Sequence, residues 1–184
     1  DVLSGLTATS AIASSISAPT MESDSGQYVI GFNKTTWLEA DLTTTSVEAI
    51  ILFRVDQLED NVLLGTGSAE KYICSWSDGL EARDSTLSMT SSQISNTGWY
   101  LAYARFKSND GYANLSGTSP ASDGEGTCTT TTKIRIGGDT AVTEMGLDGA
   151  IAAVVLNTDC NWSSLDVDAI AGNLVEHFTG LTPG

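Results

Sequence analysis

Paired carboxylates are the first residues in this 184-residue sequence that could do chemistry, because two of them placed together can hydrolyse a glycosidic bond. The closest pairs are Glu22 with Asp24, Glu39 with Asp41, and Asp166 with Asp168. We expect them in a turn, at a strand end and in the first turn of a helix, so their predicted roles are solvation and capping. The sequence has one histidine, His177, and no GxSxG motif whose serine it could activate as a general base. The sequence therefore predicts no enzyme activity.

Aromatic residues beside turns are the second kind of candidate, because an exposed ring can stack on a sugar while nearby polar groups bind its hydroxyls. Trp76 and Tyr112 lie next to turn sequences, and Asp110 lies within one. These three residues are the candidate carbohydrate site. Trp76 alternates with Tyr72 and Cys74, so packing in the core is the alternative role for it.

Calcium is the one metal ion that we consider, because it binds oxygen ligands supplied by loops. The candidate ligands are Asp139, Asp148 and Asp78, with Asp110 as a further acid in a turn. Their spacing does not match an EF-hand, and we expect no other cofactor.

The charge balance restricts the partners of the chain. It has 8 Lys and Arg against 23 Asp and Glu, a formal net charge of −15. Such a chain repels phosphate backbones and anionic lipid, so we expect neither nucleic acid nor membrane as a partner. No stretch approaches the roughly 20 apolar residues of a membrane span.

The cysteines are few and far apart. Cys74, Cys128 and Cys160 contain no CxxC pair, which argues against a zinc site. Two alternatives remain: three buried thiols, or one disulfide between Cys128 and Cys160 with one thiol left over.

Short runs of β-branched and aromatic residues between closely spaced turn signals predict an all-β fold, a two-sheet antiparallel sandwich. In residues 47–55 an apolar residue occurs at every second position, and the other face is also half apolar. Residues 149–156 are apolar on both faces too, so both segments are predicted to be central strands with a cover on the outer side.

The remaining segments follow from turn and helix signals. Residues 99–106 and 112–115 flank Asn109-Asp110-Gly111 and predict a β-hairpin. Residues 118–132 are a long loop or a polar edge strand. One short C-terminal helix is predicted, with Ser163 and Asp166 as a capping box. Its apolar stripe comprises Val167, Ile170, Ala171, Leu174 and Phe178.

The domain organisation is simple. We expect an N-terminal arm or connecting strand over residues 1–20 and one sandwich domain over residues 21–184. The apolar outer strand faces exceed what one short helix can cover, so we also expect neighbouring protein subunits or a homo-oligomer. The outer-face residues behind this expectation are Ile50, Leu52, Ile151, Ala153 and Val155.

Six segments occur in a characteristic order: YVIGFNKTTWLEA, VEAIILFRVDQ, NVLLGTGS, TGWYLAYARFKSNDGYANLSG, KIRIGG and LDGAIAAVVLNTDCNWSSLDVDAIAGNL. Over residues 25–181 this order resembles the laminin-G-like branch of the concanavalin A-like lectins and glucanases. The motifs that carry the resemblance are Gly98-Trp99, Ile136-Gly137-Gly138 and the strand from Gly149 to Val154. The Glu-x-Asp-x-Glu motif of the glucanase relatives is missing, and so are clear paired cysteines near the C-terminus.

The resemblance implies a jelly-roll sandwich and a non-catalytic role. It extends to laminin-G-like domains of phage and other virus particle proteins and of bacterial surface proteins. The expected function is a structural or interaction module on a virion surface, such as a capsid decoration, fibre or tail domain. The alternative is a carbohydrate-binding module of a secreted or cell-surface protein. Both imply a location on a virion or outside the cell.

Overall fold

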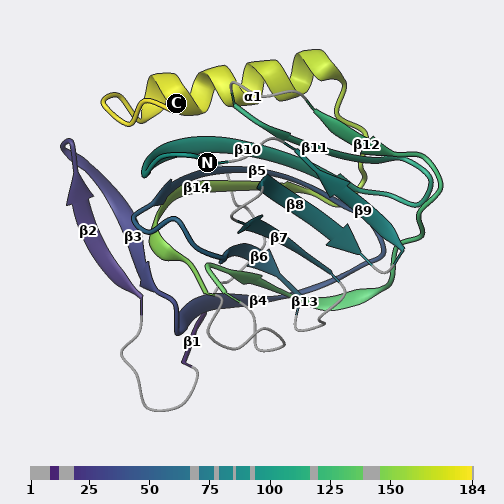
Figure 1. Ribbon diagram of the computed structural model, residues 1–184, viewed down its shortest axis with the longest axis horizontal. Coiled ribbons are helices and arrows are strands. Elements are labelled where there is room, and N and C mark those ends of the chain that lie inside the picture. Colours follow the sequence, from purple (N-terminus) through teal and green to yellow (C-terminus); the bar gives the residue numbers. More distant parts are fainter. Residues whose placement is uncertain are drawn as a thin grey trace.

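The structure is a computed structural model of two antiparallel β-sheets packed face to face (Figure 1). It describes residues 9–12, 19–66, 71–76, 79–84, 86–91, 94–116, 120–138 and 146–183.

Each sheet has seven strands. The first sheet runs in the order β1 (Thr9–Ile12), β4 (Thr36–Thr44), β13 (Thr131–Ile136), β6 (Asn61–Gly65), β7 (Lys71–Trp76), β8 (Gly79–Asp84) and β9 (Leu87–Thr90). The second sheet runs in the order β12 (Ala121–Asp123), β11 (Gly111–Leu115), β10 (Gly98–Phe106), β5 (Val47–Val55), β14 (Asp148–Asn157), β3 (Gln27–Asn33) and β2 (Thr20–Asp24). The predicted antiparallel sandwich is confirmed.

The main core lies between the two sheets. Alternate residues of β5 point into it, from Val47 through Ile51 and Phe53 to Val55, and all are at most 1% exposed. β5 pairs with β10 on one side and β14 on the other, which confirms that residues 47–55 and 149–156 form central strands. The hairpin of β10 and β11 is confirmed as well, with Asn109 at φ 61° in its turn.

The helix α1 (Ser164–His177) lies across the outer face of the second sheet (Figure 1). It is the only helix in the described part of the chain. The Ser163 hydroxyl accepts a hydrogen bond from the Asp166 N–H, and the Asp166 carboxylate accepts one from the Ser163 N–H, so the predicted capping box is present. The predicted apolar stripe is the half-buried face of the helix, and the other helical residues are exposed.

A second, smaller apolar cluster lies between this outer face and the C-terminal segment. Leu181, which is 1% exposed, packs there with Leu52, Trp99 and Ala150. Ile50 and Leu52 are fully buried within the single chain. The expected contact with a neighbouring subunit was based on the assumption that Ile50 and Leu52 are exposed on the outer face. They are instead buried within one chain, so association with other subunits remains a prediction.

One detail of β14 differs from the sequence expectation. A β-bulge between Ile151 and Ala153 shifts the register against β5, so simple alternation fails along this strand. Ala152 and Ala153 both pack in the outer cluster, whereas Ile151 and Val154 pack in the core between the sheets. The assignment of Ile151 to the outer face was therefore wrong.

Other expectations are resolved at the edges of the sheets. Within residues 118–132, the described part contains the short edge strand β12. In the expected N-terminal arm, the described residues Thr9–Ile12 form β1 at the edge of the first sheet.

Cys128 and Cys160 are both free thiols, so the alternative disulfide between them is wrong, and Cys160 is buried. In the described residues, no helix combines the length and the apolar character that a membrane span requires.

Glu39 of β4 makes stability depend on pH in the first sheet. Its carboxylate accepts hydrogen bonds from Lys133 and, at 2.8 Å, from Arg135 Nε, both on β13. The hydrogen bond from Lys133 outweighs the opposing effect of burial and, together with Arg135, holds the pKa of Glu39 below its usual 4.5. The unfolded chain therefore takes up this proton first as the pH falls. The stabilisation is complete above pH 4.5 and is lost as the pH drops through the folded pKa.

We expect Glu39→Gln to cost about 1 kcal/mol at neutral pH, and we expect this cost to shrink as the pH falls from 4.5 through the lower folded-state pKa of Glu39. Urea unfolding of both proteins over this range measures the difference, and the comparison removes the contribution of the other carboxylates. A difference that stays constant with pH would contradict the assignment.

Candidate functional site

Polar and aromatic side chains gather at one end of the outer face of the second sheet. Strand alternation brings Tyr103 and Arg105 of β10 and Tyr112 and Asn114 of β11 to this face, because the intervening alanines point into the core. The register places Tyr103 opposite Asn114 and Arg105 opposite Tyr112.

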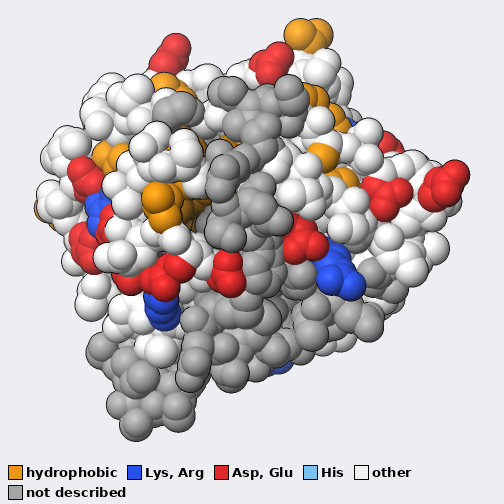
Figure 2. All heavy atoms as spheres, in the orientation of Figure 1, with side chains coloured by type: hydrophobic (Ala, Val, Ile, Leu, Met, Phe, Trp, Pro, Cys, Tyr) orange, Lys and Arg blue, Asp and Glu red, His pale blue; other side chains and the backbone are white. Residues whose placement is uncertain are grey.

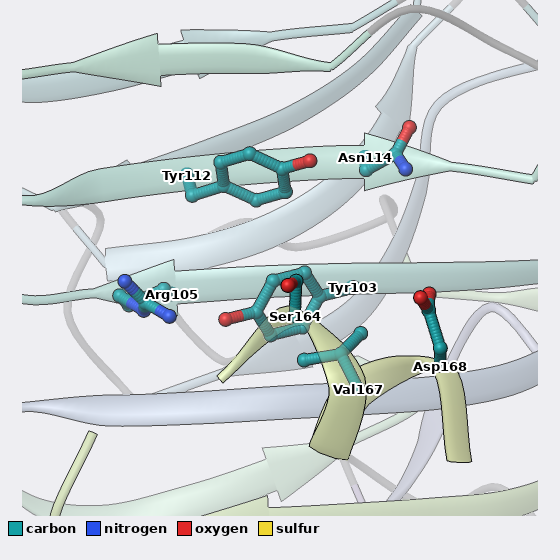
Figure 3. Close-up of a pocket in the computed structure, with 7 residues that line it drawn as sticks. All are labelled: Tyr103, Arg105, Tyr112, Asn114, Ser164, Val167 and Asp168. Atoms are coloured by element: carbon teal, nitrogen blue, oxygen red, sulfur yellow. The ribbon is translucent and has the colours of Figure 1, made fainter. Parts of the chain in front are cut away.

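The first turns of α1 complete a pocket of about 230 Å³ above these strands. Ser164, Val167 and Asp168 line it from the helix, as Figure 3 shows, and Asp168 extends its carboxylate toward the strands. Ser163 begins the helix, so the capping box fixes which residues of the first turns face the sheet.

Glu48 of β5 holds the base of the site together. Its side chain is fully buried and its carboxylate accepts four hydrogen bonds. The donors are Tyr103 Oη at 3.3 Å, Arg105 Nε at 2.7 Å, Asn157 Nδ2 at 2.9 Å and the Trp162 N–H at 3.2 Å. A buried carboxylate is tolerated only when its charge is paired and its oxygens are hydrogen-bonded, and this one meets both conditions.

Arg105 connects the hairpin to the chain that leads into α1. Its Nη2 donates to the Trp162 carbonyl at 3.0 Å, and its Nη1 donates to the Asp110 carboxylate at 3.2 Å. These contacts to the backbone of Trp162 hold the segment that leads directly into α1. The hydrogen bonds of Glu48 and Arg105 therefore position the pocket, in addition to the packing of the helix on the sheet.

The wall of the pocket is aromatic. The rings of Tyr103 and Tyr112 lie 5.3 Å apart with a 45° tilt. Burial raises the pKa of Tyr103 to about 12, so its hydroxyl stays protonated and can donate to Glu48 at any physiological pH. Tyr112 is half-buried and presents the more accessible ring.

Two polar groups at the pocket have no hydrogen-bond partner in the described part of the chain. The Asn114 Oδ1 atom is buried and has no hydrogen-bond partner there. An unsatisfied buried oxygen costs about 1–3 kcal/mol, which a ligand donor could recover directly or after a half-turn of the amide. The second is the exposed Asp168 carboxylate, which forms no hydrogen bond or ion pair within the described residues.

The structure brings two of the three predicted sugar-binding residues together. Tyr112 lines the pocket and Asp110 pairs with Arg105 at its edge. Trp76 ends β7 in the first sheet, in the opposite layer of the sandwich, and its side chain lies outside the described residues. Trp76 is therefore not part of this pocket.

Of the calcium candidates, Asp148 and Asp110 are described by the structure, and they lie far apart on the second sheet. Asp148 begins β14 next to the end of β5 that pairs with Gly98, whereas Asp110 follows the opposite end of β10. Burial, assisted by Asp56 and Glu59, raises the pKa of Asp148 above its usual value. Asp139 and Asp78 lie outside the described residues, and within these no group of three His, Cys, Asp or Glu could hold a metal ion.

The first acidic pair, Glu22 with Asp24, has a structural partner. Glu22 and Asp24 lie on β2, not in a turn as expected, and both pair with Arg54. Hydrogen bonds from Arg54, Ser25 and Trp99 outweigh burial and hold the pKa of Asp24 below its usual value. His177 is exposed in the last helical turn, with its ring edge-on to Phe178.

Sequence reasoning missed several residues that line the pocket, and it missed Glu48 beneath them. Glu48, Tyr103, Arg105 and Asn114 occupy alternate positions on strands whose other face is apolar, and that polar alternation was the available signal. Asp168 was assigned to solvation or capping, but it lines the pocket. No local pattern indicates that the first turns of the helix meet the hairpin.

Comparison with known proteins places the fold among β-sandwich domains that occur in complexes with carbohydrate. Domain 4 of AbnA, a GH43 extracellular arabinanase from Geobacillus stearothermophilus, in complex with arabinotriose, superposes with a TM-score of 0.67 at 10% identity. The match covers 89% of this chain and 87% of that domain. The binding domain of Botulinum Neurotoxin DC in complex with SialylT superposes with a TM-score of 0.63 at 9% identity.

The neurotoxin match covers 92% of this chain, which spans about half (47%) of that binding domain. No protein-family model and no curated protein sequence matches the chain. At these identities the likeness shows the fold alone, an antiparallel β-sandwich.

Proposed function

We propose that the chain is a carbohydrate-binding module that holds a sugar in the pocket between β10, β11 and α1. The observation that carries the proposal is the pair of tilted tyrosine rings beside the unpartnered amide oxygen of Asn114. A sugar needs an apolar surface for its ring and polar groups for its hydroxyls, and the pocket offers both. Its volume of about 230 Å³ suits one sugar unit rather than a long stretch of chain.

The proposal includes binding without catalysis. Glycosidic hydrolysis uses two carboxyl groups on either side of the bond, and Asp168 is the single carboxylate among the described residues that line the pocket. Glu48 lies below them with both oxygens engaged by four donors, so it is not available as an acid or base.

The comparisons support this function over the virion structural role that the sequence resemblance favours. The two similar structures come from an arabinanase and a neurotoxin, and both are complexes with saccharides. A location on a virion or another extracellular surface is compatible with glycan binding and rests on the sequence alone.

We expect Tyr112→Ala to weaken glycan binding about tenfold or more, because it removes the accessible ring of the pocket. Binding is measured first on an array of neutral and acidic oligosaccharides that includes arabinotriose, and then by calorimetric titration of the best ligand. Tyr112→Phe keeps the ring and should retain most of the affinity.

Tyr28→Ala is the matched control. Tyr28 is 75% exposed on β3 of the same sheet, three strands away from β10. This variant should bind as the wild-type protein does. Equal losses in both variants, or no loss in Tyr112→Ala, would contradict the assignment of the site.

A further inference from the structure

The charged side chains around the pocket bear on which class of sugar it can bind. Arg105 is the single cation among the described residues that line the pocket, and each of its three side-chain nitrogens already donates a hydrogen bond. The acceptors are Glu48, Asp110 and the Trp162 carbonyl, at 2.7, 3.2 and 3.0 Å. Since Glu48 and Asp110 both contact this guanidinium, its positive charge is balanced before any ligand arrives.

Asp168 adds a further negative charge on the helix side. The residue is exposed and lines the pocket, and among the described residues it forms no ion pair. Lys107 also lies near the site. Its Nζ is 3.6 Å from the Asp110 carboxylate, so Lys107 and Arg105 both pair with Asp110. Counting Arg105 and Lys107 against Glu48, Asp110 and Asp168 leaves one net negative charge around the pocket.

The wider surface reinforces this local balance. The chain carries a formal net charge of −15, and Figure 2 shows acidic side chains scattered over the face in view with few basic ones among them. A carboxylated ligand would therefore approach against the field of the whole protein as well as that of Asp168.

We infer that the pocket selects uncharged sugars and rejects acidic ones such as uronic and sialic acids, with Asp168 as the specificity-determining residue; this inference rests on the proposed glycan binding at the same pocket. The physical reason is that a ligand carboxylate finds no uncompensated cation and meets Asp168 instead. The hydroxyls of a neutral sugar can donate to the Asp168 carboxylate, which turns the same group into a favourable contact.

The test uses matched pairs of oligosaccharides that differ by a carboxylate in place of a hydroxymethyl group, such as galactose and galacturonic acid oligomers. We expect the wild-type protein to bind the neutral member about tenfold or more tightly at low ionic strength. Asp168→Asn should reduce this ratio severalfold. Glu176→Gln removes one charge from the exposed far end of the same helix and should leave the ratio unchanged.

The outcomes separate the two proposals. Equal or tighter binding of the acidic members, or a ratio that Asp168→Asn and Glu176→Gln change to the same extent, overturns the selectivity and leaves glycan binding in place. If the protein binds no member of any pair and no sugar on the array, both proposals fail.

Discussion

Replacing Glu48 with alanine should lower the free energy of unfolding by about 3–5 kcal/mol, because it breaks a buried charged network by removing one side of it. The variant leaves the guanidinium of Arg105 without its buried counter-ion. It also leaves the Trp162 N–H and the Asn157 amide without an acceptor in the interior. For a chain of this size, the melting temperature should fall by roughly 6–20 °C.

Glu22→Ala provides the matched control for this prediction. Glu22 also pairs with an arginine of the second sheet, Arg54, at 3.3 Å, but its side chain is 40% exposed. Exposed ion pairs contribute about 0–1 kcal/mol, so this variant should unfold almost as the wild-type protein does. Urea unfolding measures both variants. If they lose the same amount of stability, Glu48 is not the structural centre of the site.

The Glu48 variant also has a consequence for binding. Tyr103 and Arg105 are held by the same carboxylate, and Arg105 in turn holds the backbone at the start of α1. Glu48 is thus a positioning residue for the pocket. Under conditions where Glu48→Ala is still folded, its glycan affinity should fall, although Glu48 is not among the residues that line the cavity.

Leu181→Asp should also destabilise the protein by several kcal/mol. Leu181 is 1% exposed and packs with Val29, Leu52, Trp99 and Ala150 on the outer face of the second sheet. An aspartate there would place an unpaired charge in an apolar cluster. Gly180, at φ 93°, turns the chain so that Leu181 can reach this position. Thermal unfolding followed by circular dichroism measures the loss.

Leu165→Asp is the control because it makes the same chemical change at a leucine of α1 that is 77% exposed. It should change the free energy of unfolding by no more than about 0.5 kcal/mol. An unchanged melting temperature in Leu181→Asp would show that the C-terminal segment does not seal the outer face.

The fold was largely predictable because its strongest signals are local. The alternation in Val47–Val55 marks a strand with a buried face, and its bounds match β5. Ser163 and Asp166 mark the start of the helix by a hydrogen-bonding pattern that needs no distant partner. The bulge at Ile151 and Ala153 could not be predicted, since it depends on how β14 fits against β5 nearly 100 residues earlier in the chain.

The site was predictable only in part, for a related reason. Tyr112, which lies next to a tight turn, and Asp110, which lies within it, could be selected as candidates because a turn is a local feature. The contacts that build the pocket join residues far apart in sequence, such as Arg105 with Glu48 and with Trp162. Which strand lies next to which, and where the helix crosses them, decides these contacts, and neither follows from the composition of a single segment.

The most direct test of glycan binding at this pocket is the position of a bound sugar. Backbone amide NMR shifts, recorded while the best ligand from the array is titrated in, report where it contacts the protein. We predict that the largest shift changes fall on β10 and β11 around Tyr103, Tyr112 and Asn114, and on the first turns of α1 around Asp168. Shift changes centred on the first sheet around Trp76, with none at these positions, would contradict the assignment of the pocket as the binding site.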